Sequence, residues 1–140
     1  MIDASISLAP ARDVIAIDLW DGDLPALPGR TIRVEPSRWW LLDGPAVGEV
    51  RTAIGDRGAA APIGGGLIRA TIAGPGWREL LSVSGFIDTE ILRDGDVIGT
   101  VIHHVPVRVL VTGDQACEVW FAASFAETLD ELWKRAAKGG

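Results

Sequence analysis

The sequence predicts an α+β fold, with one mixed, mostly antiparallel sheet and about three helices packed on it. Short runs rich in β-branched residues recur between turn-forming residues, which is typical of strands. Three other segments have apolar residues at helical spacing and ends marked by Gly, Pro or Ser. The length of 140 residues is typical of one domain. We therefore expect residues 1–140 to form a single domain around one core.

Strands are expected where β-branched and aromatic residues are bounded by turn formers. The clearest is residues 13–20 (DVIAIDLW), which the loop 21–29, with two prolines and two glycines, follows. The other predicted strands are residues 31–34, 38–42, 67–73, 97–103, 107–111 and 116–121.

A Gly-Pro pair opens each of the first two helices, and Gly55 and Gly85 are expected to end them. Pro45 is predicted at the first helical position, where its missing N–H costs nothing. The third helix is predicted to begin with a capping box, in which Ser124 and Glu127 satisfy each other's backbone N–H groups. Its apolar stripe is formed by Phe125, Leu129, Leu132, Trp133 and Ala136.

The composition excludes several classes of protein. A hydrophobic fraction of 48% and a mean hydropathy of +0.25 exclude a disordered chain. The net charge of −6 disfavours nucleic acid, because an acidic surface repels phosphates. No apolar run approaches the roughly 20 residues that cross a membrane, and no basic segment at the N-terminus indicates a secretory signal. Together with the single cysteine, Cys117, these features predict a cytoplasmic protein.

The sequence contains no recognisable catalytic, cofactor or metal motif. The glycine-rich stretch 55–66 lacks both nucleotide-binding fingerprints and is expected to be a loop. His103 and His104 are predicted on a strand, where neighbours point to opposite faces and cannot share a metal ion. Cys117 lies on an apolar strand face and is expected to be a buried structural thiol. The acidic residues between 88 and 96 are expected to be solvated turn residues. We therefore predict no catalytic residue on this chain.

The six tryptophans, in a chain without tyrosine, point to a binding partner. Trp77 and Trp133 lie on apolar helix stripes and are expected in the core. Trp39 and Trp40 are adjacent on a strand, so one must face outward if the other is buried, and Trp20 closes a strand beside a loop. Exposed tryptophans are enriched at interfaces, which makes these last three a candidate partner interface. The alternative is that helices or loops cover both faces of these strands.

Several segments, in their order and spacing, resemble the gamma subunit of heterotetrameric sarcosine oxidase. That family shares the folate-binding fold of aminomethyltransferases and of the N-terminal domain of a tRNA-modifying GTPase. Asp88 stands where the family places an aspartate. The matching segments are residues 24–25, 35–42 (EPSRWWLL), 73–81 (AGPGWRELL), 99–111 and 119–129.

The resemblance implies a non-catalytic accessory subunit of a sarcosine oxidase-like complex. Its partners would be the large alpha subunit, on which sarcosine is oxidatively demethylated to glycine, and the other subunits. FAD, FMN, NAD, folate and zinc are expected on those partners, and no activity is expected for the isolated chain. The alternative is a free-standing folate or one-carbon binding module. Pro62 argues against independent one-carbon transfer, because aminomethyltransferase relatives have a carboxylate near that position. A tRNA-binding module is least compatible with the net charge.

Overall fold

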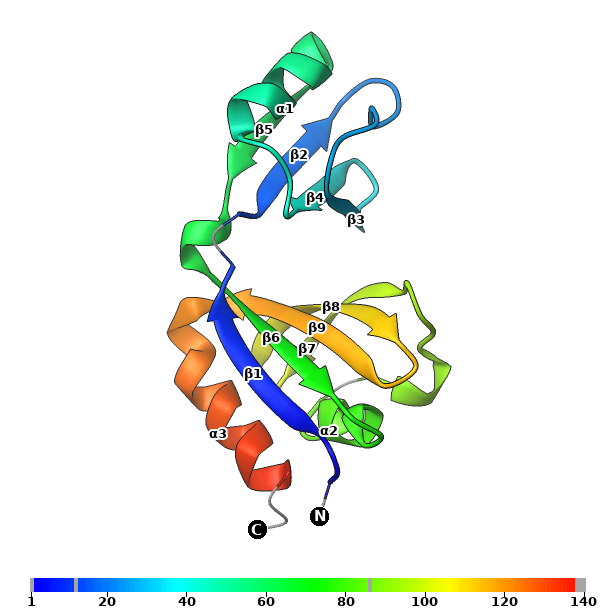
Figure 1. Cartoon of the computed structure of the whole chain (residues 1–140), viewed down its shortest axis with the longest axis vertical. Helices are drawn as coiled ribbons and strands as arrows, with labels where there is room; N and C mark the ends of the chain where they lie inside the picture. Colours follow the sequence, from blue (N-terminus) through cyan, green and yellow to red (C-terminus); the bar gives the residue numbers. More distant parts are fainter. Residues whose placement is uncertain (1, 12, 86, 138–140) are drawn as a thin grey trace. The chain divides into compact units, whose positions relative to one another are not determined.

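A computed structural model describes residues 2–11, 13–85 and 87–137 of the chain. The chain divides into two compact units. The larger unit is formed by Met1–Pro10 and Leu67–Gly140, and the smaller unit is the continuous segment Ala11–Gly66. The smaller unit is thus an insertion between two segments of the larger one (Figure 1).

The larger unit contains a five-stranded sheet in which every neighbouring pair is antiparallel (Figure 1). Its spatial order is β1-β6-β9-β8-β7, so β1 and β7 are the edges. The strands are β1 (Ser5–Pro10), β6 (Leu67–Ala73), β7 (Val97–Ile102), β8 (Val105–Gly113) and β9 (Ala116–Ala122).

Two helices, α2 (Trp77–Ser82) and α3 (Ala126–Ala137), cover one face of this sheet (Figure 1). Trp77 of α2 and Trp133 of α3 are 1% and 0% exposed, which confirms that both are core residues. They belong to one apolar cluster with inward-facing strand residues, including Val109, Cys117, Val119 and Phe121.

The smaller unit has a four-stranded antiparallel sheet of order β3-β4-β2-β5, with helix α1 (Val47–Ile54) against it. Its strands are β2 (Ile15–Leu19), β3 (Arg30–Glu35), β4 (Arg38–Leu42) and β5 (Gly58–Pro62). Its core is aliphatic and consists of Ile15, Ile17, Leu19, Leu41, Val50, Ile54 and Ala60.

The predicted α+β class, with mostly antiparallel strands and three α-helices, is confirmed over the described residues. Two details of the prediction, the single sheet and the single core, are wrong. The strands form two sheets, and each unit has its own apolar cluster. The reason is the insertion: β2 to β5 pair only with one another and bury their own residues against α1. The assignment of residues 1–140 to a single domain stays a prediction.

The predicted starts of α1 and α3 are wrong by one or two residues. Helix α1 begins at Val47 with Ala46 as its N-cap, so Pro45 lies before the helix and not at its first position. Gly55 ends α1 as predicted, with a φ of 59°. Helix α3 follows a 3-10 turn over Ala123–Phe125, so Ser124 lies inside that turn and not at an N-cap. The predicted capping box is therefore incorrect.

The glycine-rich stretch is not one loop, because residues 58–62 form strand β5. Its pairing with β2 is close: a Cβ on Gly58 would lie 2.1 Å from the carbonyl oxygen of Asp18. Only glycine allows this approach. His103 and His104 are also misplaced by the prediction, since they form the turn between β7 and β8. Their φ values of 50° and 67° are typical of a two-residue hairpin turn.

Candidate partner interface

Trp20 follows the last residue of β2 and is 67% exposed. Its backbone N–H donates to the carbonyl of Arg57 at 3.0 Å, and its indole Nε1 donates to the carbonyl of Asp56, also at 3.0 Å. The ring is therefore held at its polar edge while most of its surface faces solvent. A partner that covers this ring would immobilise few additional rotatable bonds, because the side chain is already held in place. This lowers the entropic cost of association.

The loop that follows Trp20 is tied to the same segment. Arg57 Nη1 donates to the carbonyl of Asp23 at 3.0 Å. Gly22 allows this arrangement, because its φ is +79° and a Cβ there would lie 2.7 Å from the Arg57 guanidinium. The surroundings of Trp20 thus come from two segments, residues 20–23 and 56–57, that are far apart in the sequence.

Trp39, on β4, lies on the face of the sheet that α1 covers. It is opposite Ile17 on β2 and packs against the aliphatic core of the smaller unit. The guanidinium carbon of Arg33 lies 5.2 Å from the ring centroid, close enough for a cation–π interaction. Arg33 is itself held by donation from Nε to the carbonyl of Pro36 at 3.0 Å. Trp39 is half-buried and supports the fold.

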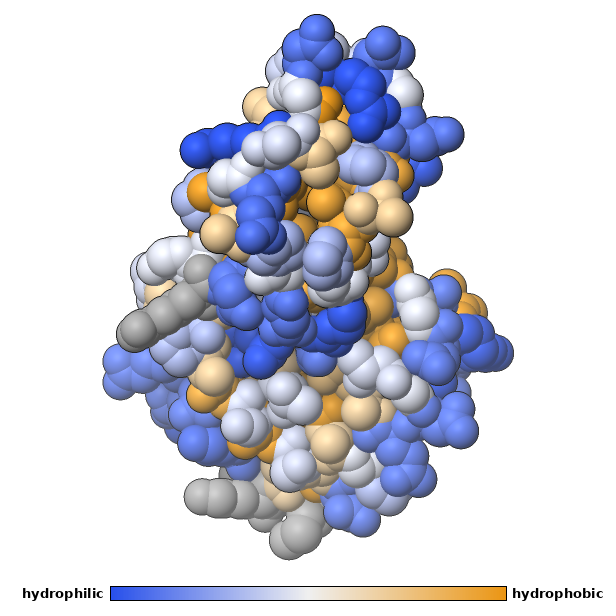
Figure 2. All heavy atoms as spheres, turned by 45° about the horizontal axis from the view of Figure 1, so that its top comes forward, coloured by the Kyte–Doolittle hydropathy of each residue, from blue (hydrophilic) through white to orange (hydrophobic). Residues whose placement is uncertain are grey.

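Trp40 points to the opposite face, because neighbouring residues of a strand alternate. It is half-buried and lies opposite Ala16 on β2 and Ile32 on β3. The three candidate tryptophans therefore do not form one patch, and only Trp20 is largely exposed. Their assignment to a partner interface stays a prediction, and the geometry favours Trp20. Figure 2 shows hydrophobic residues among hydrophilic ones on the surface of the smaller unit.

Asp18, two residues before Trp20, forms an ion pair with Arg38 across β2 and β4. The distance from Arg38 Nε to Asp18 Oδ1 is 2.7 Å, and Nη2 donates to Oδ2 at 3.2 Å. The hydrogen bond and the charge of Asp18 raise the pKa of Arg38 above its ordinary value. This two-point pairing holds the end of β2, from which Trp20 extends, against β4.

Asp88, Asp96 and Cys117 have structural roles. Asp88 accepts from the backbone N–H of Glu90 at 3.1 Å, and Asp96 accepts from that of Arg93 at 2.8 Å, so both stabilise turns. Burial, with a smaller contribution from the charge of Glu118, raises the pKa of the Cys117 thiol to about 12. A thiol with that pKa stays protonated near neutral pH and is a poor nucleophile.

The described residues contain neither a candidate metal-ion cluster nor a helix that could span a membrane. In residues 2–11, 13–85 and 87–137, no three His, Cys, Asp or Glu side chains are grouped so that they could hold a metal ion. Over the same part of the chain, no helix has the length and apolar character needed to span a membrane.

Comparison with solved structures shows the fold. The chain is similar to a chain of the heterotetrameric sarcosine oxidase from Corynebacterium sp. U-96, solved in complex with pyrrole 2-carboxylate. The TM-score is 0.81 at 15% sequence identity, and the match covers 96% of this chain and 84% of the other. The chain therefore has the fold of a sarcosine oxidase subunit. No protein-family model and no curated protein matches the sequence.

Two features of the surface were missed by the sequence analysis. The attachment of the Trp20 indole to Asp56 could not be predicted, because it uses a backbone carbonyl and carries no side-chain signal. Strand β1 was also missed, together with a groove beside it on α3. The alternation of polar and apolar residues in Ser5–Pro10 was a usable signal for that strand.

Proposed function

We propose that the chain is a non-catalytic accessory subunit of a sarcosine oxidase-like complex. In this complex, the large subunits carry the oxidative demethylation of sarcosine to glycine. The observation that carries the proposal is the fold match over 96% of this chain and 84% of the other. Because most of each chain is covered, the two chains are of similar length, as expected for equivalent subunits.

The residues agree with a role in assembly. Trp20 presents a fixed, exposed indole of the type that dominates binding energy at interfaces. Cys117 is buried in the core, and Asp88 and Asp96 accept backbone hydrogen bonds in turns. In this proposal the large alpha subunit is a partner, the complex is cytoplasmic, and the FAD, FMN, NAD, folate and zinc sites lie on the other subunits.

Co-purification from the native cells tests the proposal, with mass spectrometry and flavin absorbance of what the chain retains. We expect a flavin-containing large subunit in stoichiometric amount. Trp20→Ala should weaken its retention by about thirtyfold or more, because hot-spot truncations cost about 2 kcal/mol or more. Ile91→Ala is the matched control, since Ile91 is an equally exposed apolar side chain, at 66%, in the larger unit.

Recovery of the chain alone would contradict the proposal. Calorimetry with a panel of folates then tests the alternative of a free-standing folate or one-carbon binding module. Saturable heat from a folate would support that alternative, and its absence would reject it.

A further inference from the structure

Strand β1 is the open edge of the five-stranded sheet. It pairs with β6 from Ser5↔Ala73 to Pro10↔Ile68, and among the described residues no strand pairs with its other side. Edge strands are usually protected by charged residues, prolines or bulges, since their free N–H and C=O groups can accept another strand. Here the only such protection within the strand is Pro10, at its end, and no charged residue is present.

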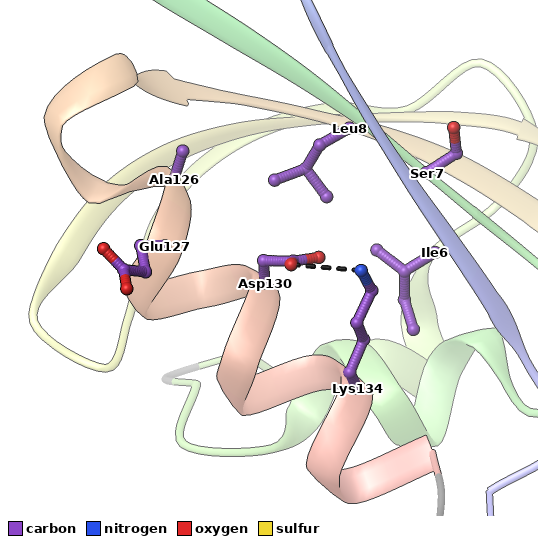
Figure 3. A pocket seen from close by; sticks show the side chains of 7 residues that line it. All are labelled: Ile6, Ser7, Leu8, Ala126, Glu127, Asp130 and Lys134. Atoms are coloured by element: carbon purple, nitrogen blue, oxygen red, sulfur yellow. Dashed lines mark hydrogen bonds and ion pairs between the residues drawn. The ribbon is translucent and has the colours of Figure 1, made fainter.

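A groove of about 610 Å³ lies between β1 and α3 (Figure 3). Ile6 and Leu8 point from β1 toward α3, whereas Ser7 points away, as the alternation of a strand requires. The helix contributes one small apolar residue and three charged ones. The lining consists of Ile6, Ser7, Leu8, Ala126, Glu127, Asp130 and Lys134.

The charges of the groove are not balanced. Lys134 Nζ lies 3.1 Å from Asp130 Oδ2, so this carboxylate already has a cation. Glu127 is exposed and has no hydrogen bond or ion pair within the described part of the chain. The groove therefore combines apolar side chains on β1 with an excess carboxylate on α3.

We infer that this edge is a docking site for an extended segment of a partner protein that carries lysine or arginine at alternate positions. The segment adds to β1 as a further strand, and main-chain hydrogen bonds supply much of the affinity. Alternate side chains then lie on the α3 side of the sheet. A long basic side chain fits there because its aliphatic stem covers Ile6 and Leu8 while its charged end reaches Glu127.

Charge favours such a partner over a second copy of this chain. The segments that form the larger unit carry eleven of the nineteen acidic residues but only seven of the thirteen basic ones. Pairing of two β1 edges would bring two such acidic units together, with Glu127 near the interface in both. Like charges in contact disfavour association, whereas a basic segment removes the imbalance.

The site can be tested with synthetic peptides and the full chain. The probe is a capped hexapeptide of alternating Lys and Val. One comparison peptide has Glu in place of Lys, and another is the Lys-Val peptide with alternate backbone nitrogens methylated to block strand pairing. Binding is measured by titration calorimetry, and its location by NMR shifts and hydrogen exchange of the β1 amides.

The expected result is binding of the Lys-Val peptide alone, with shifts and slower exchange confined to β1 and the facing side of α3. Glu127→Arg should weaken binding about fivefold through the lost charge pair. Glu131→Arg is the matched control on the same helix and should change binding by less than about twofold, because Glu131 lies outside the groove and its pair with Arg135 is exposed.

Three results would overturn the inference. These are no binding of the Lys-Val peptide, equal binding of the methylated or Glu-Val peptide, and shifts located elsewhere on the chain. Concentration-dependent dimerisation with β1 shifts in the absence of peptide would also overturn it, because the occupant would then be a second copy.

The inference extends the proposed function by naming a docking surface and the chemistry of its partner, and the two fail separately. Peptide binding at β1 without retention of a flavoprotein would leave the site in place and remove the sarcosine oxidase-like role. Retention of the flavoprotein without peptide binding would support the sarcosine oxidase-like role and remove the docking site.

Discussion

In the larger unit Trp77 and Trp133 are almost completely buried, and both helices add to a core that includes these rings. In the smaller unit the core is formed by aliphatic residues, and Trp20 is 67% exposed. Helix α3 has twelve residues and α1 has eight, so packing against its sheet stabilises α1 less. The larger unit thus buries its two helix tryptophans in its core, whereas the smaller unit keeps Trp39 half-buried against an aliphatic core and leaves Trp20 exposed.

The largest expected effect is at Trp133. Trp133→Ala should lower the free energy of unfolding by about 3–5 kcal/mol, because it removes a fully buried ring that contacts Phe121 edge-on. Trp39→Ala should cost less than half as much, since Trp39 is only half-buried. Urea denaturation of both variants measures the difference. Equal losses would mean that the smaller unit depends on its tryptophans as the larger one does.

A smaller effect is expected at the end of α1. Gly55 has a φ of 59° and a ψ of −133°, a conformation that side chains strongly disfavour. Gly55→Ala should therefore destabilise the protein by about 1–3 kcal/mol. Gly48 lies inside α1, with no atom within 4 Å of an added Cβ. Gly48→Ala should stabilise the protein by about 0.5–1 kcal/mol.

Thermal denaturation distinguishes the two glycine variants, because the melting temperature should fall for one and rise for the other. A fall for both would show that α1 tolerates no added side chain. A rise for both would contradict the role assigned to the conformation of Gly55.

The smallest effect is expected at Ser124. The structure places this residue in the 3-10 turn before α3 and not at an N-cap. Ser124→Ala should change the free energy of unfolding by less than about 0.5 kcal/mol, as for most exposed positions. A loss of about 1 kcal/mol in chemical denaturation would instead restore the capping box that the sequence predicts. It would also show that α3 needs its cap as well as its buried residues.

Side-chain patterns predicted most of the fold, and backbone geometry explains most of what they missed. Periodic apolar residues predict strand β2 and the buried faces of α2 and α3. Strand β5 has only Gly, Ala and Pro, which carry no strand signal, and it exists because its backbone pairs with β2. The turn at His103 and His104 uses positive φ values, which are uncommon for residues other than glycine.

The candidate interface was predictable only in part. The choice of Trp20 followed from its place between a strand and a loop, and the structure shows that it is exposed. For Trp39 and Trp40 the alternation of the strand was predictable. The degree of burial was not, because it depends on Arg33 and on the aliphatic core that meets Trp39.

The insertion of the smaller unit has a consequence for the order of folding. Strands β1 and β6 are spatial neighbours, but the chain between them is the whole of Ala11–Gly66. If that segment is unfolded, closing it costs about 3 kcal/mol more than closing a two-residue turn. Within this segment, β2 pairs with β5 and places Ile15 opposite Pro62, which brings the two ends of the segment together. Folding of the insert thus makes the pairing of β1 with β6 nearly local. If the insert folds late, the edge strand β1 also pairs late.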